Sequence, residues 1–177
     1  MLVTGSLLEI ETTLGVIGIE LDRVNAPLTS DYFTKLADIG ALDGTSFFRI
    51  VTFANNSYNP DIPIHVVQGG RMDDAPEVVP PIQHESTSET GLSHKKWCVS
   101  LARYGIGETY GSFFIAMRDE PALDYGGDRH PDKQGFAVFG MVTTGKNIVE
   151  AIFLKAEENE FLKDRIQIVS ARVSKQL

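Results

Sequence analysis

Cysteine is nearly absent from this chain, and its absence excludes two ways of stabilising a fold. Cys98 is the only cysteine among 177 residues, so the chain cannot form an internal disulfide or supply a cysteine cluster for zinc. The histidines, His65, His84, His94 and His130, show no metal-ligand spacing. The sequence therefore predicts no bound metal, and nothing in it calls for a cofactor.

Basic residues and long apolar runs are also scarce, which bears on partners and location. Lys and Arg number 16 against 24 Asp and Glu, and the net charge of -8 argues against a nucleic-acid or anionic-membrane partner. No run approaches the roughly 18 apolar residues of a membrane span. The N-terminus also lacks a basic segment followed by an apolar stretch. We therefore expect a cytoplasmic location, or a periplasmic one if a leader is removed before residue 1; we also expect a monomer.

The length and the hydrophobic share fit one domain. With 177 residues, of which 42% are hydrophobic, the chain can bury one sizeable core, and we expect a single domain over residues 1–177. Apolar residues that alternate with polar ones predict a hairpin around the turn at 13–15 and a closing strand over 165–173. Further short strands are predicted at 47–51, 65–68, 98–102, 113–117 and 137–139.

Two segments have helical spacing. Thr29 is a suitable N-cap for the first predicted helix, which shows an apolar face up to Gly40, and the second predicted helix covers 147–154. Many short strands with two helices predict a mainly β fold, a closed or nearly closed antiparallel barrel with helices at its ends.

Familiar catalytic motifs are missing. There is no G-x-S-x-G, P-loop, H-E-x-x-H or C-x-x-C. The unusual feature is Arg49 inside the apolar run TSFFRIV (45–51), because arginine is rarely fully buried unless it is paired. Taken alone, the stretch fits an arginine that points outward from a half-exposed strand and rests its stem on apolar neighbours. The alternative is an arginine that lines a cleft with apolar walls and functions there.

A series of motifs gives the sequence a family resemblance. In order along the chain these motifs are FFRIV, VVQGG, PPIQHE, GLSHKKWCVSLAR, GSFFIAM, ALD, FAVFG and GKNIVEAI. Their order and spacing resemble those of bacterial cyclophilin-type peptidyl-prolyl cis-trans isomerases over nearly the whole chain. The resemblance implies an eight-stranded antiparallel β-barrel capped by two α-helices, with an active cleft on the outside. It also implies that the chain accelerates X–Pro bond rotation in proline-containing peptides and in unfolded or flexible proteins.

The resemblance also implies roles for residues at matching positions. Arg49 matches the catalytic arginine, and Gln68 matches the glutamine that would hold it and contact the substrate backbone. The remaining matches are expected to bind the substrate: His65, Val66, Ala102, Arg103, Ser112, Phe114, Leu123 and Phe136.

The chemistry of the reaction explains why these residue types belong together. Amide resonance sets a barrier of about 18–20 kcal/mol to rotation of an X–Pro bond, and no bond is made or broken. A catalyst must grip the proline ring, leave the other side free to rotate, and favour the twisted amide over both planar forms. Apolar side chains supply the grip, and a guanidinium can donate to the proline nitrogen or to the prolyl carbonyl.

Several positions depart from the family pattern. Ser112 stands where a glutamine is usual, Ala122 replaces the tryptophan of many eukaryotic members, and Tyr104 replaces a small residue. These departures leave open a second function, that of a cyclophilin-fold peptide-binding module with weak or no isomerase activity. Loss of the tryptophan also predicts weak binding of cyclosporin. Two lengthened loops, 52–64 and 125–135, are either tolerated insertions or walls that restrict access to the proline pocket.

Overall fold

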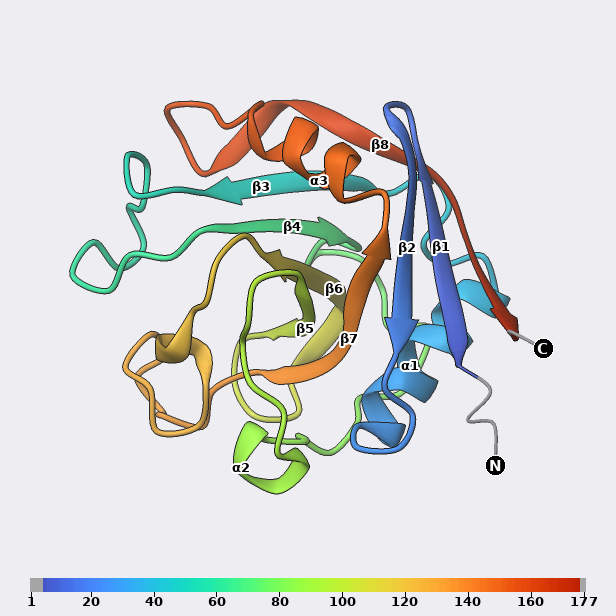
Figure 1. Cartoon of the computed structure of the whole chain (residues 1–177), viewed down its shortest axis with the longest axis horizontal. Helices are drawn as coiled ribbons and strands as arrows, with labels where there is room; N and C mark the ends of the chain where they lie inside the picture. The colour runs from blue at the N-terminus through green and yellow to red at the C-terminus, as the bar shows by residue number, and fades with distance from the viewer. Residues whose placement is uncertain (1–4, 176–177) are drawn as a thin grey trace.

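The computed structural model describes residues 5–175, so residues 1–4 and 176–177 of the predicted domain lie outside the described range. Eight antiparallel strands close into a barrel (Figure 1) in the order β1-β2-β7-β5-β6-β4-β3-β8. The strands are β1 Ser6–Thr12, β2 Gly15–Leu21, β3 Ser46–Val51, β4 Val66–Gly70, β5 Cys98–Arg103, β6 Thr109–Ala116, β7 Ala137–Thr144 and β8 Phe161–Lys175. The prediction of a mainly β fold, a closed eight-stranded antiparallel barrel, is confirmed.

Two helices cap the barrel, also as predicted. Helices α1 (Pro27–Asp38) and α3 (Lys146–Phe153) lie at opposite ends (Figure 1), and each buries an apolar face against the strands. A one-turn helix, α2 (Thr87–Thr90), and a 3-10 turn at Pro121–Leu123 complete the set of helical elements in residues 5–175. The sequence does not predict these two segments, because elements this short leave no hydrophobic periodicity to detect.

The N-terminus of α1 is capped from a distant part of the chain. The helix begins at Pro27 and its N-cap is Ala26, so the prediction that Thr29 is the N-cap is wrong. The Glu85 carboxylate accepts hydrogen bonds from the backbone N–H groups of Leu28 and Thr29, at 3.0 and 2.8 Å, and from the Thr29 hydroxyl at 2.6 Å. A carboxylate at this end satisfies free N–H groups and complements the helix dipole.

Apolar side chains fill the interior of the barrel, as in other barrels of this size. Inward-facing residues such as Leu8 and Ile10 of β1 are almost completely buried in this core. Cys98 belongs to a small separate cluster with Ala116 and Val138. Burial raises the pKa of the Cys98 thiol to about 12.

A bulge in β3 determines which way Arg49 points. The register of β3 shifts between Phe47 and Arg49 against both neighbouring strands. Phe47 and Ile50 lie in the interior core, whereas Phe48 and Arg49, adjacent in the sequence, both line a cavity on the outside of the barrel. An extra residue in one strand interrupts the alternation of faces and re-aims side chains. The bulge therefore brings Arg49 to the outer surface between two buried neighbours.

Candidate active site

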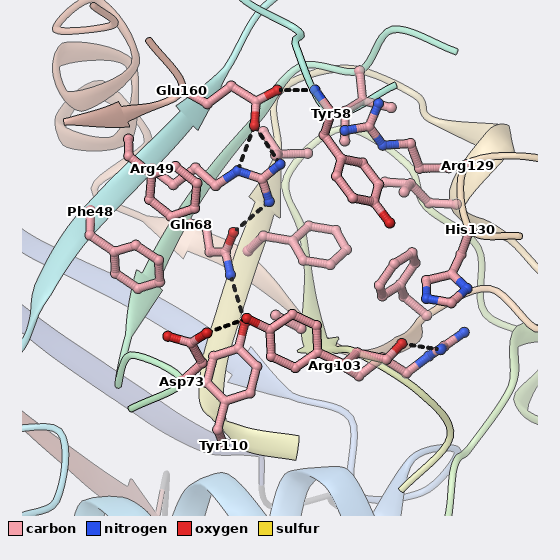
Figure 2. Close-up of a pocket in the computed structure, with 18 of the residues that line it drawn as sticks. Phe48, Arg49, Tyr58, Gln68, Asp73, Arg103, Tyr110, Arg129, His130 and Glu160 are labelled. Carbon is pink, nitrogen blue, oxygen red and sulfur yellow. Dashed lines mark hydrogen bonds and ion pairs between the residues drawn. The ribbon is translucent and has the colours of Figure 1, made fainter. Parts of the chain in front are cut away.

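The cavity lies over the outer face of β3, β4, β6 and β5 and has a volume of about 410 Å³ (Figure 2). A cluster of apolar side chains, separate from the barrel core, forms one side of the cavity. We call this cluster the apolar wall. The members of the apolar wall are Val51, Ile64, Val66, Ala102, Phe114 and Leu123, with Phe136 packed against them. The structure thus brings together Val66, Phe114, Leu123 and Phe136, the residues expected to grip a proline ring.

Alternation along the segment that leads into β4 selects the residues that face the cavity. Ile64, Val66 and Gln68 line it. His65 does not line the cavity, contrary to expectation, and its ring packs against Phe53 with centroids 4.0 Å apart. Neighbouring residues of an extended segment point to opposite faces, so the pocket position expected for His65 belongs to Ile64.

Arg49 is held in place by two side chains. Its Nε and Nη2 donate to Oε2 of Glu160 at 3.0 and 2.6 Å, and its Nη1 donates to Oε1 of Gln68 at 3.1 Å (Figure 2). The guanidinium carbon also lies 5.4 Å from the ring centre of Phe161. The Arg49 side chain remains 20% exposed. Because a guanidinium has five N–H donors, two donors remain for a ligand in the cavity.

Glu160 is a site residue that sequence reasoning missed. It lies 111 residues after Arg49 and is 4% exposed. Burial alone would raise the pKa of this carboxyl, but the charge and hydrogen bonds of Arg49, together with hydrogen bonds from the backbone of Tyr58 and Ser57, outweigh burial and hold the pKa below its ordinary value. Its second oxygen, Oε1, accepts hydrogen bonds from the backbone N–H groups of Ser57 and Tyr58 at 2.8 and 3.2 Å. One carboxylate therefore joins Arg49 to the loop 52–64.

Gln68 is fixed on its other side by two hydroxyl groups. Its Nε2 donates to Oγ of Ser112 at 3.0 Å and to the hydroxyl of Tyr110 at 3.4 Å. Ser112 is fully buried, donates to the carbonyl of Gly69 at 3.2 Å, and does not line the cavity. The expectation that Ser112 binds substrate is therefore corrected: it orients Gln68, and Tyr110 lines the cavity instead.

A second register shift lies in β5, between Leu101 and Arg103, and both Ala102 and Arg103 line the cavity. The Arg103 guanidinium donates to the Asp132 carboxylate at 2.8 and 3.0 Å and lies 5.0 Å from the ring centre of Phe136. These hydrogen bonds lower the pKa of Asp132 to about 2. The side chain of Arg103 thus secures the segment that carries Phe136.

The two long loops meet beside the cavity. Tyr58 of the loop 52–64 and Arg129 of the loop 125–135 both line it. Nη1 of Arg129 donates to Oδ1 of Asn56 at 2.8 Å, and its guanidinium carbon lies 5.3 Å from the ring centre of Tyr58. The loops therefore form one continuous wall.

A Ser–His–Asp arrangement, with its serine and histidine buried, lies beneath the apolar wall. Nδ1 of His94 is 2.6 Å from Oδ1 of Asp124, and its Nε2 is 3.0 Å from Oγ of Ser100. Ser100 is fully buried, so its hydroxyl cannot reach a substrate carbonyl as in a hydrolase. The His94 ring stacks on Phe114 with centroids 5.9 Å apart. The arrangement therefore supports Phe114 from below.

Residues 5–175 show neither a cluster of metal ligands nor a helix that could span a membrane. No three His, Cys, Asp or Glu side chains in this range gather as metal ligands would. None of the helices described is long and apolar enough to cross a membrane.

Known proteins resemble this chain along most of its length. The family model for cyclophilin type peptidyl-prolyl cis-trans isomerase/CLD matches residues 7–173. A peptidyl-prolyl cis-trans isomerase of Streptomyces antibioticus is 30% identical over 151 residues, which is 83% of this chain and 82% of that protein. Peptidyl-prolyl cis-trans isomerase A of Dickeya dadantii is 30% identical over 152 residues, or 84% of this chain and 71% of that protein.

Solved structures share the fold. A cyclophilin type peptidyl-prolyl cis-trans isomerase of Cryptosporidium parvum has a TM-score of 0.77 at 17% identity, with 98% of this chain and 99% of that chain covered. A second crystal structure of that protein, obtained in the presence of the dipeptide Ala-Pro, has a TM-score of 0.75 and covers 96% and 99%. The match of the family model over 7–173, together with the barrel, shows that this chain belongs to the cyclophilin-type peptidyl-prolyl cis-trans isomerases.

Proposed function

We propose that Arg49 is the catalytic residue of this isomerase and that the apolar wall holds the proline ring of the substrate. One observation carries the proposal: the Arg49 guanidinium is fixed by Glu160 and Gln68 at the edge of the cavity, with two N–H donors left over. Donors fixed in advance need no reorganisation when charge develops in the transition state.

The proposed mechanism follows from the electronic structure of the amide. In the twisted state the proline nitrogen regains its lone pair, and Arg49 donates to that nitrogen or to the prolyl carbonyl. A hydrogen bond to a charged group contributes about 1.5–3 kcal/mol, which is roughly 10- to 150-fold in rate. The fixed field of the site and the grip of Val66, Phe114 and Leu123 on the ring supply the remainder.

A protease-coupled assay on a short X–Pro peptide tests the role of Arg49. Arg49→Ala is expected to lower kcat/KM at least about tenfold with little change in far-UV circular dichroism, although the melting temperature should fall because buried Glu160 loses its partner. Arg49→Lys should also lose activity, because a point charge cannot reproduce the planar fork that Glu160 and Gln68 hold. Wild-type activity in Arg49→Ala would contradict the mechanism.

The substrates and setting of the enzyme are part of the same proposal. We propose proline-containing peptides and unfolded or flexible proteins as substrates, and the presence of Ala-Pro with the C. parvum relative supports a peptide ligand. We also propose a monomer located in the cytoplasm, or in the periplasm if a leader is removed before residue 1. Sedimentation analysis tests whether the enzyme is a monomer, and cell fractionation tests its location.

Cyclosporin is expected to bind weakly. Ala122 stands where many eukaryotic members have a tryptophan, and its side chain does not line the cavity. The Ala122 carbonyl instead accepts a hydrogen bond from the Arg129 backbone at 3.2 Å. Tight inhibition of the wild-type enzyme in the peptide assay would show that the family correspondence through 121–124 is wrong.

A further inference from the structure

Arg129 is a buried cation whose charge is not matched by a carboxylate. The residue is 4% exposed, and no Asp or Glu side chain within residues 5–175 lies 4.0 Å or less from its guanidinium nitrogens. Its Nη1 donates to neutral acceptors of the loop 52–64 instead. These are Oδ1 of Asn56 at 2.8 Å and the carbonyls of Asn59 and Ile62 at 3.1 and 2.9 Å.

The other two arginines that line the cavity are neutralised. Arg49 pairs with Glu160 at 2.6 Å, and Arg103 pairs with Asp132 at 2.8 Å. Arg129 therefore leaves its end of the cavity positive. Burial and the neighbouring charge of Arg49 lower the pKa of the Arg129 guanidinium. A buried charge of this kind is stabilised by an anion brought into contact with it.

Arg129 also keeps donors for a ligand. A guanidinium has five N–H groups, yet every hydrogen bond that this side chain makes to another described residue leaves from Nη1. Arg129 lines the cavity beside the exposed ring of Tyr58 (Figure 2). Because the loop acceptors already fix the fork, little side-chain freedom would be lost when an anion binds.

We propose that Arg129 forms an anion-binding subsite that receives an acidic side chain next to the proline of a substrate peptide. The planar guanidinium fork matches a carboxylate in shape and charge. This inference rests on the proposed function, because a neighbouring carboxylate is presented to Arg129 only when a proline occupies the apolar wall.

The opposite end of the cavity carries the opposite charge. Asp73 lines the cavity across Gln68 from Arg129 (Figure 2) and accepts a hydrogen bond from the hydroxyl of Tyr104. An acidic substrate residue would be repelled there. The preference for an acidic residue is therefore expected on one flank of the proline and not on the other.

Two matched series of short peptides test the subsite. One series places Glu, Gln or Lys immediately before the proline, and the other places them immediately after it, with all other residues uncharged. Isomerisation is measured by NMR exchange, because protease coupling depends on substrate charge. In one series the wild type should show a kcat/KM about three- to tenfold higher for Glu than for Gln. The ratio should shrink as salt rises from about 0.15 M to about 0.5 M.

The net charge of the chain, -8, makes this a stringent test, since the overall field repels acidic peptides. Arg129→Gln should bring the Glu-to-Gln ratio to about one, as expected for a single screened ion pair. Arg118→Gln is the matched control, because Arg118 is a partly exposed arginine that pairs with Glu120 and does not line the cavity. That variant should keep the wild-type ratio.

Equal wild-type rates on Glu and Gln peptides in both series would overturn the subsite, even if Arg129→Gln fails to fold. An unchanged ratio in folded Arg129→Gln would overturn it as well. Absence of wild-type activity on every peptide, the Gln peptides included, would overturn the proposed function and the subsite with it. Activity on the Gln peptides without a charge preference would overturn the subsite alone.

Discussion

The two carboxylate oxygens of Glu160 accept hydrogen bonds from different parts of the molecule. Oε2 accepts the two hydrogen bonds from Arg49, and Oε1 accepts those from the backbone N–H groups of Ser57 and Tyr58. A glutamine amide has only one acceptor oxygen, so it cannot serve both sets of donors. Glu160 is therefore a positioning residue that acts through Arg49.

Glu160→Gln should lower kcat/KM about 5- to 150-fold, because leaving a buried donor unpaired costs roughly 1–3 kcal/mol. The loss should fall on kcat more than on KM, since the apolar wall that holds the ground state is unchanged. Steady-state kinetics on a short X–Pro peptide separates the two parameters.

Glu158→Gln is the matched control, because Glu158 is an exposed glutamate close to Glu160 in the sequence. Its kinetics should equal those of the wild type. A loss confined to KM in Glu160→Gln, or an equal loss in both variants, would show that Glu160 does not position the arginine.

Individual residues show which parts of the site can be predicted from the sequence and which cannot. Val66, Gln68 and Phe114 are placed at the cavity by the family resemblance of the motifs VVQGG and GSFFIAM, and the structure puts all three there. The pairing of Glu160 with Arg49 spans 111 residues, and no local pattern encodes such a contact.

At the scale of elements, α1 depends on a contact that its own sequence does not supply. Its N-cap, Ala26, has no side-chain acceptor, and the Glu85 carboxylate takes that role from another segment. Glu85 is 9% exposed, so water does not replace it readily. The helix is thus tied to a loop that lies more than fifty residues away in the sequence.

Glu85→Ala should lower the free energy of unfolding by about 1–2 kcal/mol, the usual effect of losing a helix cap. Urea denaturation measures the change. Activity per folded molecule should be retained, because Glu85 does not line the cavity. Glu77→Ala, the same substitution at an exposed position, should leave the unfolding free energy almost unchanged. A similar loss in both variants would show that capping by Glu85 is unimportant.

Strand boundaries were predicted less well than strand positions. The strand predicted from Phe113 begins at Thr109, and the strand predicted to end at Phe139 continues to Thr144. In the structure Thr109 pairs with Arg103 and Thr144 pairs with Gly18. Neighbouring strands of the barrel extend these segments, and this tertiary effect is absent from local propensity.

At the scale of the whole molecule, acid should loosen the contacts that organise the cavity. The hydrogen bonds of Arg103 lower the pKa of Asp132 to about 2. For Glu160, burial opposes ionisation, but Arg49 holds the pKa below its ordinary value. A carboxyl with a lowered folded-state pKa stabilises the fold above its unfolded pKa, and this contribution disappears as the pH falls through the folded pKa.

Asp132→Asn tests this dependence. At neutral pH the variant should have a smaller free energy of unfolding than the wild type, because it lacks the charged partner of Arg103. The difference should shrink below about pH 4, the ordinary range of an aspartate pKa, and vanish near the folded pKa of about 2. Urea denaturation at several pH values gives the difference, with Asp128→Asn on the same loop as the control. A difference that grows in acid would contradict the assigned role of Asp132.

The labelling rate of the buried Cys98 thiol can be used to measure how often the barrel opens. Cys98 is the only cysteine in the chain, and its burial keeps both reagents and ionisation away from the sulfur. The rate at which a thiol reagent labels the wild-type protein therefore reports how often this part of the barrel opens. A cysteine introduced at the exposed Asp61, on the loop 52–64, would be the only reactive thiol of the closed molecule. A dye attached there would report events at the cavity while the site residues stay unaltered.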